Sequence, residues 1–568
     1  MYKLYKNYFL KLSIICANIF QKQLGFIMLV FFFNIATSGY VLFYSGKNSL
    51  LINYAFSTFF TSFCVGGIVT LISNSHLQKL VRFLLVSILF ILFLLDAFVS
   101  YNYKTSVESG MINAILETNQ REVIEFFSTY CDTTMMLFII FLLIIGSLLE
   151  KYIRKYISQI PIVRIQKTLG FILILGILCT IRGVCIYKSS YIEEFLFPRF
   201  YIFTMEAVNN INEYKNLNSK VNINIPTIIE NKSEIKNIVF IVGESTNRNH
   251  MSIYNYYNNT TPNLKKMQEN QQLFVFKDVI SPHSVTNLVL KKLFTFCNYE
   301  SHAPWYNYNN IISILKLAGY KTYWLSNQES SGAYENSATV LSNLCDQKVF
   351  TRYRHSFEDY AEYDGALLPI LDNEIKDKAK KKFFVIHLTG SHINYSKRYP
   401  KEYDIFHEQD IKSNFGTSQK QIIAQYDNSI LYNDYIIQEI IQRFQNDEAI
   451  IIYVSDHGEE VYDYRDFFGH SEENGSKYMV EIPMVIWTSE QFNNKYQSKV
   501  KCIEDALEKP YMTDDMIHTI LDLAEIETPE FDETRSLINK NFNTQRKRIC
   551  HKQNYDNELE DVQSRATN

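Results

Sequence analysis

Five apolar segments occupy the first 187 residues, and they constrain the architecture of the chain more than any other feature. Each is close to the ~20 apolar residues that an α-helix needs to cross a bilayer. They span residues 26–44, 51–72, 80–100, 133–149 and 169–186. A cleaved signal peptide does not explain them, because the segments recur and no small-residue cleavage site follows the first. The sequence therefore predicts a five-helix transmembrane domain over residues 1–187.

The basic residues between these segments predict the direction of the helices. Lys and Arg gather before the first segment, between the second and third, and between the fourth and fifth. With five spans these three stretches lie on one side, which the positive-inside rule makes the cytoplasm. We therefore expect a cytoplasmic N-terminus, and we expect everything after Ile186 to lie outside the cytoplasm.

The loop at residues 101–132 falls on the outer side, and its charged residues are mostly acidic. Within it, residues 111–127 have helical periodicity. Two interpretations are open: a helix that lies on the membrane surface, or a flap over an active site. Residues 188–233 are expected to form a connector, helical at first and then irregular.

Beyond residue 233, β-like runs alternate with helical patterns. Strands are predicted at 237–242, 321–325, 383–388, 449–455 and 483–487, and helices at 309–318, 365–380, 420–445 and 512–524. Such alternation is typical of a mainly parallel α/β sheet with helices on both faces. We assign residues 234–545 to this domain and 546–568 to a polar tail. Active sites of such sheets lie at the carboxyl ends of the strands.

Acids and histidines follow several of these strands. The buried run NIVFIVGEST places Glu244 just after its strand, and YVSDHGEE places Asp456 and His457 after another. Carboxylates together with an imidazole suit a zinc-like cation. The alternative for Asp456 and His457 is a pair that caps the next helix. The presence of Glu244 in the same chain favours the metal site.

Two further segments carry histidines. HLTGSH follows the strand at 383–388 and contains His387 and His392, which can bind a second metal or hold a phosphate oxygen. His470, in FGHSEENG, lies thirteen residues after His457. By itself His470 would be read as a surface residue.

Thr286, in SPHSVTNLVLKKLF, is the candidate nucleophile. It opens an apolar helical stretch, and a hydroxyl at a helix N-terminus lies in a positive field beside free N–H groups. That environment favours an alkoxide next to a phosphate. The alternative is a simple N-cap threonine.

Net charge and cysteine content limit the remaining options. The formal net charge of −4 provides no basic excess for nucleic acid. The nine cysteines show no CxxC or zinc-finger spacing. Cys297 and Cys345 can form a disulfide if their domain lies outside the cytoplasm, but the sequence does not prove the pairing.

The motifs GES, SPHSVT, HLTGSH, SDHGEE and GHS occur in one order and together resemble a known family. They look like those of the phosphoethanolamine transferases of Gram-negative envelopes, in the sulfatase-like branch of the alkaline phosphatase superfamily. The resemblance covers nearly the whole chain, including the five spans. RNHMSIYNYYNNTTPNL (248–264) and YDNSILYNDYIIQEII (426–441) support it.

The resemblance implies a role for each matching residue. Glu244, Thr286, Asp456 and His457 match the primary zinc ligands, and Thr286 also matches the nucleophile. His392 and His470 match histidines that hold the phosphoethanolamine group or a second zinc. His387 matches another histidine of the same motif, and Glu459 an acid near the substrate amine.

The chain departs from the lipid A branch at the candidate nucleophile, and from the wider family pattern at two other positions. No Cys pair flanks Thr286, so SPHSVT looks more like the branch that modifies the lipopolysaccharide core. Tyr254-Asn255-Tyr256 replaces a YGY motif, which a left-handed Asn tolerates. The lysine that some relatives use for the donor phosphate has no clear match in WLSNQESSG (324–332), where Gln328 is a weak substitute.

The resemblance implies a ping-pong transfer of phosphoethanolamine. The donor is phosphatidylethanolamine, the acceptor is lipopolysaccharide, and Thr286 carries the covalent intermediate. A sulfatase would need a C/S-x-P-x-R context, which the chain lacks. A glycerol-phosphate transferase of the lipoteichoic acid synthase type is the closer alternative, and a catalytically inactive membrane scaffold is the alternative from another class.

Overall fold

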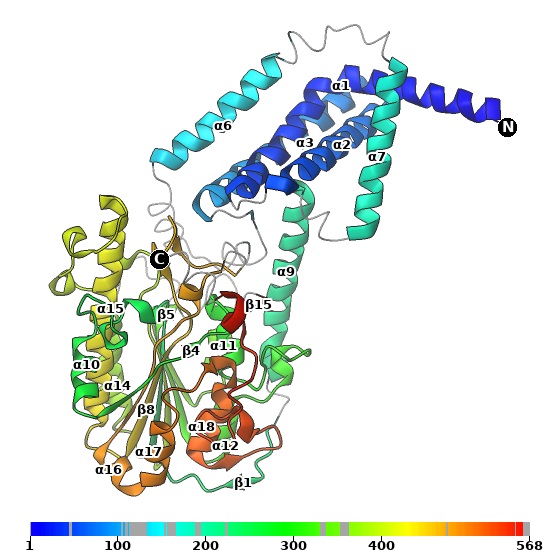
Figure 1. Cartoon of the computed structure of the whole chain (residues 1–568). Coiled ribbons are helices and arrows are strands. Elements are labelled where there is room, and N and C mark those ends of the chain that lie inside the picture. The colour runs from blue at the N-terminus through cyan, green and yellow to red at the C-terminus, as the bar shows by residue number, and fades with distance from the viewer. Residues whose placement is uncertain are drawn as a thin grey trace. The chain divides into compact units, whose positions relative to one another are not determined.

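The protein is described here by a computed structural model. It describes residues 2–44, 48–103, 106–107, 112, 133–152, 155, 166–187, 195–221, 225–329, 337–352, 363–472, 475–550 and 552–559. By its internal contacts the chain divides into two compact units (Figure 1). The N-terminal unit comprises residues 1–116 and 120–209, and the C-terminal unit comprises 117–119 and 210–568. The helix predicted at 111–127 lies outside the described residues, apart from Ile112.

The N-terminal unit is helical. It contains α1 (Tyr2–Tyr44), α2 (Asn48–Thr70), α3 (Ser75–Tyr103), α6 (Thr133–Tyr152), α7 (Gln166–Tyr187) and the first half of α9 (Leu196–Val221). Among its described residues, three helical stretches are long and apolar enough to cross a membrane, Tyr8–Phe43, Leu51–Thr70 and Ser75–Asn102, and Thr133–Leu148 is a shorter apolar helix. Helices therefore form at all five predicted segments. The count of five membrane spans stays a prediction.

A seven-stranded sheet organises the C-terminal unit. Its order is β3-β11-β8-β2-β7-β5-β6. The strands are β2 (Asn237–Gly243), β3 (Leu273–Phe276), β5 (Lys321–Glu329), β6 (Gln347–Arg352), β7 (Lys382–His387), β8 (Ala449–Ser455) and β11 (Met484–Thr488). The five strands from β8 to β6 pair in parallel, whereas β11 runs antiparallel to both β8 and β3.

The sheet is thus mixed, with a parallel core and an antiparallel edge. All five predicted strands form, and β3 and β6 are strands that the sequence pattern did not reveal. β11 reverses direction because no α-helix lies in the described connection between β8 and β11, and a parallel pairing needs a crossover.

Alternation along β2 divides the hydrophobic core into two layers. Ile238, Phe240 and Val242 face one layer, together with side chains of α11 (Thr286–Leu293), α12 (Ile311–Leu317) and α18 (Met516–Ala524). Val239 and Ile241 face the other layer, with α10 (Pro262–Glu269), α14 (Leu367–Glu374) and α15 (Thr417–Phe444). Helices therefore cover both faces of the sheet, as the α/β pattern predicts (Figure 1).

Short elements complete the C-terminal unit. They are the helices α13 (Ser337–Ser342), α16 (Glu490–Lys495) and α17 (Gln497–Glu504) and the paired strands β1 (Glu230–Asn231) with β13 (Ile526–Glu527), β4 (Val279–Ile280) with β12 (Tyr511–Met512), β9 (Glu460–Val461) with β10 (Phe468–Gly469), and β14 (Ile549–Cys550) with β15 (Gln553–Asn554). Cys297 and Cys345 are both free thiols, so they do not form the disulfide considered above.

Candidate active site

The register of the two central strands brings two carboxylates together. β2 and β8 pair in parallel and end level with each other, Gly243 opposite Ser455. Glu244 and Asp456 are the next residues after the two strands, and both are buried. The Ser245 N–H donates to Asp456 Oδ1 at 3.1 Å, which ties the two strand ends together. Strand pairing therefore places two acids at the carboxyl edge of the sheet.

His457 and Thr286 complete the group. His457 Nε2 lies 3.2 Å from Glu244 Oε1 and 3.6 Å from Asp456 Oδ2. Thr286 is the first residue of α11, and its hydroxyl donates to Glu244 Oε2 at 3.1 Å. Its Oγ1 is also 3.4 Å from His457 Nε2. All four residues predicted as ligands or nucleophile thus converge, from three separate segments of the chain.

The electrostatics of this group fit a bound cation. Burial and the Glu244 carboxylate raise the pKa of Asp456 to about 7. Burial by itself would lower the pKa of His457, but Asp456 and Glu244 raise it to about 10. Asp456 Oδ2 is buried and accepts no hydrogen bond from any described residue. Two crowded carboxylates, an imidazole and one unsatisfied oxygen form a donor set that suits zinc.

A second potential ligand group lies beside the first. Single ligand atoms of His457, Glu459 and His470 all lie within 4.8 Å of one another, as do those of Glu244, Asp456 and His457. His470 Nδ1 is 2.6 Å from Glu459 Oε2, and the rings of His457 and His470 are 4.3 Å apart. Tyr395 donates its hydroxyl to Glu459 Oε1 at 2.7 Å.

His387 is the last residue of β7, which pairs with β2 on the side opposite β8, and His392 lies five residues further on. His387 pairs in register with Val242 and Ser326, and it is fully buried. Burial lowers its pKa to about 4, so the imidazole is neutral at physiological pH. His392 is partly buried, near enough to Glu244, Glu459 and His470 to interact with them electrostatically.

Gln328 contacts one of the candidate metal ligands directly. Its amide nitrogen donates to Glu244 Oε2 at 3.0 Å and to the Leu388 carbonyl at 3.1 Å. The sequence placed Gln328 among the residues that contact the donor. In the structure its amide orients a candidate metal ligand.

Sequence reasoning missed several residues that support the site. Tyr426 of α15 donates to the Ser245 carbonyl at 2.6 Å and accepts from the Asn247 N–H at 2.8 Å, so it holds the loop after Glu244. The His250 ring lies between two carboxylates. Its Nδ1 is 2.9 Å from Asp427 Oδ1, and its Nε2 is 3.1 Å from Asp463 Oδ1. Tyr426 and His250 occur in stretches whose resemblance was noted, and Tyr395 lies three residues beyond HLTGSH, but nothing local in the sequence indicates the partners of these residues.

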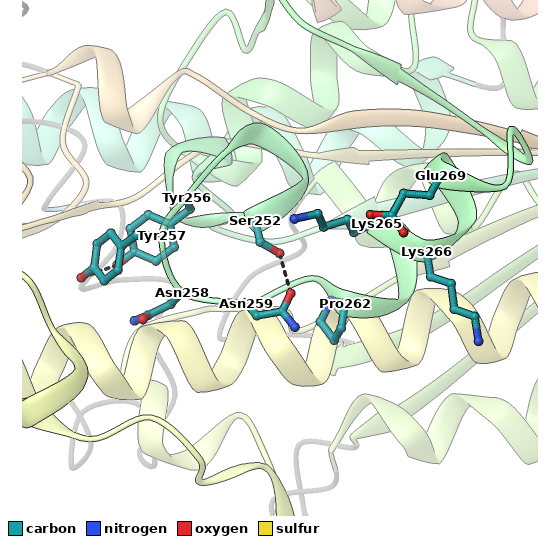
Figure 2. Close-up of a pocket in the computed structure, with 9 residues that line it drawn as sticks. All are labelled: Ser252, Tyr256, Tyr257, Asn258, Asn259, Pro262, Lys265, Lys266 and Glu269. Carbon is teal, nitrogen blue, oxygen red and sulfur yellow. Dashed lines mark hydrogen bonds between the residues drawn. The ribbon is translucent and has the colours of Figure 1, made fainter.

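A cavity in the C-terminal unit lies outside the group formed by Glu244, Thr286, Asp456 and His457. It has a volume of about 360 Å³ and includes none of the predicted site residues (Figure 2). It is lined by Ser252, Tyr256, Tyr257, Asn258, Asn259, Pro262, Lys265, Lys266 and Glu269. The candidate active site is therefore defined by its chemistry at the sheet edge, and not by the depth of a pocket.

The hydroxyl of Thr286, at the N-terminus of α11, faces buried candidate metal ligands at the carboxyl edge of an α/β sheet, and this arrangement fits an enzyme of the alkaline phosphatase superfamily. Comparison with known proteins agrees. A family model described as "Sulfatase" matches residues 236–526, and the chain belongs to this family. A second model, "Phosphoethanolamine transferase EptA/EptB", matches residues 64–193.

Individual relatives support the same assignment. The phosphoethanolamine transferase EptC of Escherichia coli O18:K1:H7 is 31% identical over 320 residues, which is 55% of this chain and 55% of that protein. The chain thus spans about half the length of this curated relative. The C-terminal periplasmic domain of EptC from Escherichia coli, solved in complex with Zn, is 29% identical, with a TM-score of 0.54 over 59% of this chain and 98% of that one.

One solved relative covers both units. It is the integral membrane lipooligosaccharide phosphoethanolamine transferase A of Neisseria meningitidis, with a TM-score of 0.60 over 92% of this chain and 98% of that one. At 19% identity the similarity concerns the fold alone. It shows that apolar N-terminal helices and a sulfatase-like α/β domain also occur together in another protein.

Proposed function

We propose that the protein is a zinc-dependent phosphoethanolamine transferase of the inner membrane. It moves phosphoethanolamine from phosphatidylethanolamine to lipopolysaccharide, on the core or on lipid A. The observation that carries the proposal is the contact of Thr286 with Glu244 and His457, at 3.1 and 3.4 Å. The name of the family model that matches residues 64–193 and the name of the relative EptC support phosphoethanolamine as the transferred group.

Glu244, Thr286, Asp456 and His457 would hold the zinc, and the count of one or two ions stays open. A zinc ion there would supply Lewis acidity and lower the pKa of a bound hydroxyl. Glu244 and Asp456 are both buried, so little water reaches the carboxylates that face the nucleophile. The N-terminus of α11 adds peptide dipoles that favour negative charge at Thr286 Oγ1. These features support Thr286 as the group that accepts the phosphoryl group and then releases it.

The substrate would be held by residues around this centre. Thr286 Oγ1 attacks the phosphorus of the donor, diacylglycerol leaves, and a hydroxyl or phosphate of the acceptor then displaces the threonine. His392 and His470 would stabilise charge on the phosphoryl oxygens, and the buried His387 would support the same site. The buried carboxylate of Glu459, oriented by Tyr395, suits the ammonium group of ethanolamine. Gln328 would also contact the phosphatidylethanolamine donor.

The location follows from the chain's two parts. Apolar helices anchor the protein in the bilayer that holds its lipid donor. We propose that the N-terminus is cytoplasmic and that the C-terminal unit works in the periplasm, as the positive-inside rule predicts. No role in nucleic acid binding is proposed, because the formal net charge is −4.

Mass spectrometry of the intact protein tests the proposal. After incubation with phosphatidylethanolamine and no acceptor, the protein should gain one phosphoethanolamine group, and peptide mapping should place that group on Thr286. Glycerol phosphate on Thr286 would support the lipoteichoic-acid-type alternative instead. Lipopolysaccharide from cells with and without the gene, split into lipid A and core, would then identify the acceptor.

A further inference from the structure

The first half of α9 carries an exposed apolar stripe. Phe197, Tyr201, Met205 and Val208 are 51%, 60%, 44% and 37% exposed. Their spacing of four, four and three residues places them on one helical face, within about 80° of one another at 100° per residue. Four large apolar side chains in a row on one exposed face call for a covering surface.

The opposite face of the same turns packs onto the end of α3. Leu196 is buried in a cluster with Phe93 and Ala97, and Phe200 packs against it. Phe203 packs against Val99 in a neighbouring cluster. These contacts run in order along both helices, so the first turns of α9 lie beside the last turns of α3.

A buried ion pair fixes this arrangement. Arg199 Nη2 lies 3.2 Å from Asp96 Oδ2, and both side chains are buried. Asp96 also accepts a hydrogen bond from Thr37 of α1, at 2.5 Å, and another from the Val107 N–H, at 3.0 Å. The beginning of α9 is thus attached to two membrane-length helices. Asp96 lies within Ser75–Asn102, which is one of the three stretches long and apolar enough to span a bilayer.

The stripe on α9 matches the lipid-facing surface expected for α3. On α3, Leu84, Ile88, Ile91 and Leu95 are 49%, 42%, 58% and 45% exposed, with a similar helical spacing. The polarity of α9 changes half-way along. Its first thirteen residues, LFPRFYIFTMEAV, are mostly apolar, and the next thirteen, NNINEYKNLNSKV, are mostly polar. The apolar half extends about 20 Å at 1.5 Å per residue.

We propose that Phe197, Tyr201, Met205 and Val208 form a lipid-contacting surface, buried at the boundary between headgroups and acyl chains in the leaflet where α3 ends. Such helices lie in the interface with their apolar face toward the acyl chains, and Tyr is enriched at that level. The partner is the phospholipid bilayer itself. The helix therefore leaves the membrane near residue 208, where its sequence becomes polar.

Fluorescence quenching by lipid tests this surface. Tyr201→Trp in the full-length protein is reconstituted into phosphatidylcholine vesicles whose acyl chains carry bromine near the headgroup. The parent protein, with its three tryptophans, is measured in parallel and its emission subtracted. Glu206→Trp is the matched control, because residue 206 is exposed but lies about 140° around the helix from residue 201.

We expect brominated lipid to remove about half or more of the emission that Tyr201→Trp adds, and much less of the emission that Glu206→Trp adds. Aqueous iodide should show the reverse order. If iodide but not brominated lipid quenches the probe at position 201, the stripe faces water and the proposal fails. If neither quenches it, protein covers the stripe, from a second copy or another chain, and the proposal also fails. Met205→Trp repeats the test if the first variant does not fold.

Discussion

The side-chain amide of Gln328 donates to Glu244 Oε2 at 3.0 Å, although the two residues are 84 positions apart in the chain. A second hydrogen bond, to the Leu388 carbonyl, holds the amide in place. Gln328 therefore holds the Glu244 carboxylate in its orientation. We expect the removal of this amide to lower the affinity for the metal before it affects other properties of the protein.

Gln328→Ala should weaken zinc binding by roughly 10- to 100-fold, which is typical when a partner of a metal ligand is removed. The physical reason is that the Glu244 carboxylate loses the donor that fixes its orientation. Competition with a chromophoric chelator measures the affinity. Gln421→Ala, at an exposed position on α15, is the matched control. An unchanged zinc affinity in Gln328→Ala would show that the hydrogen bond does not orient the ligand.

Thr286→Ala should lower the rate of transfer by at least about a thousandfold, because removing a nucleophile eliminates the step it carries. Thr286→Ser should keep part of the activity, since it retains the hydroxyl at the start of α11. The assay follows labelled phosphoethanolamine from donor to acceptor, with circular dichroism as a check of folding. Normal transfer by the folded alanine variant would rule out Thr286 as the nucleophile.

Asp456→Ala and His457→Ala should each lose bound zinc, because the remaining ligands cannot hold the ion alone. Elemental analysis of the purified variants provides the readout. Glu460→Gln is a suitable control, since Glu460 is also buried but pairs with Arg465 at 2.8 Å. One zinc per chain in Asp456→Ala would contradict the ligand assignment.

The stability of the C-terminal unit should fall as pH rises from about 6.5 toward 10. Burial by itself would lower the pKa of His250, but Asp463 and Asp427 raise it to about 10. A pKa raised on folding contributes stability that is complete below the ordinary value of 6.5 and is lost as pH rises through 10. At about 1.4 kcal/mol per pKa unit, the decline due to His250 should reach at least about 2 kcal/mol.

Denaturant unfolding at several pH values, followed by tryptophan emission, checks this decline. Trp305, Trp324 and Trp487 are the three tryptophans of the chain, and all lie in the C-terminal unit. His250→Gln should be less stable at pH 6.5 and should show a flatter dependence on pH. Parallel curves for the parent and the variant would mean that His250 is not charged in the folded protein.

Removing one member of the Asp96–Arg199 pair should destabilise the N-terminal unit by about 3–5 kcal/mol, because a buried charge remains without its partner. Asp96→Leu with Arg199→Leu should be less destabilising than either single change. Thermal unfolding in detergent is measured for the parent, the two single variants and the double variant. Compared as a double-mutant cycle, these values give the interaction free energy of the two charges. Additive effects would show that the two charges do not interact.

The local patterns of the sequence determined much of this protein. The apolar segments predicted the helices of the N-terminal unit, and short β-branched runs predicted five strands of the sheet. Glu244, Asp456 and His457 were recognisable because each follows such a run, and parallel strands end at one edge. Thr286 was recognisable because it opens a helix. These signals are local, since they depend on the period of a helix or a strand.

Tertiary structure alone decided which residues meet across long distances in the chain. β3 and β6 are edge strands, whose short sequences carry little signal, and the antiparallel direction of β11 depends on its connection. The contacts of Gln328 with Glu244, Tyr395 with Glu459 and Arg199 with Asp96 join segments 64 to 103 residues apart. A side chain's partner across such distances is set by packing and strand register, because neither leaves a period in the sequence around it.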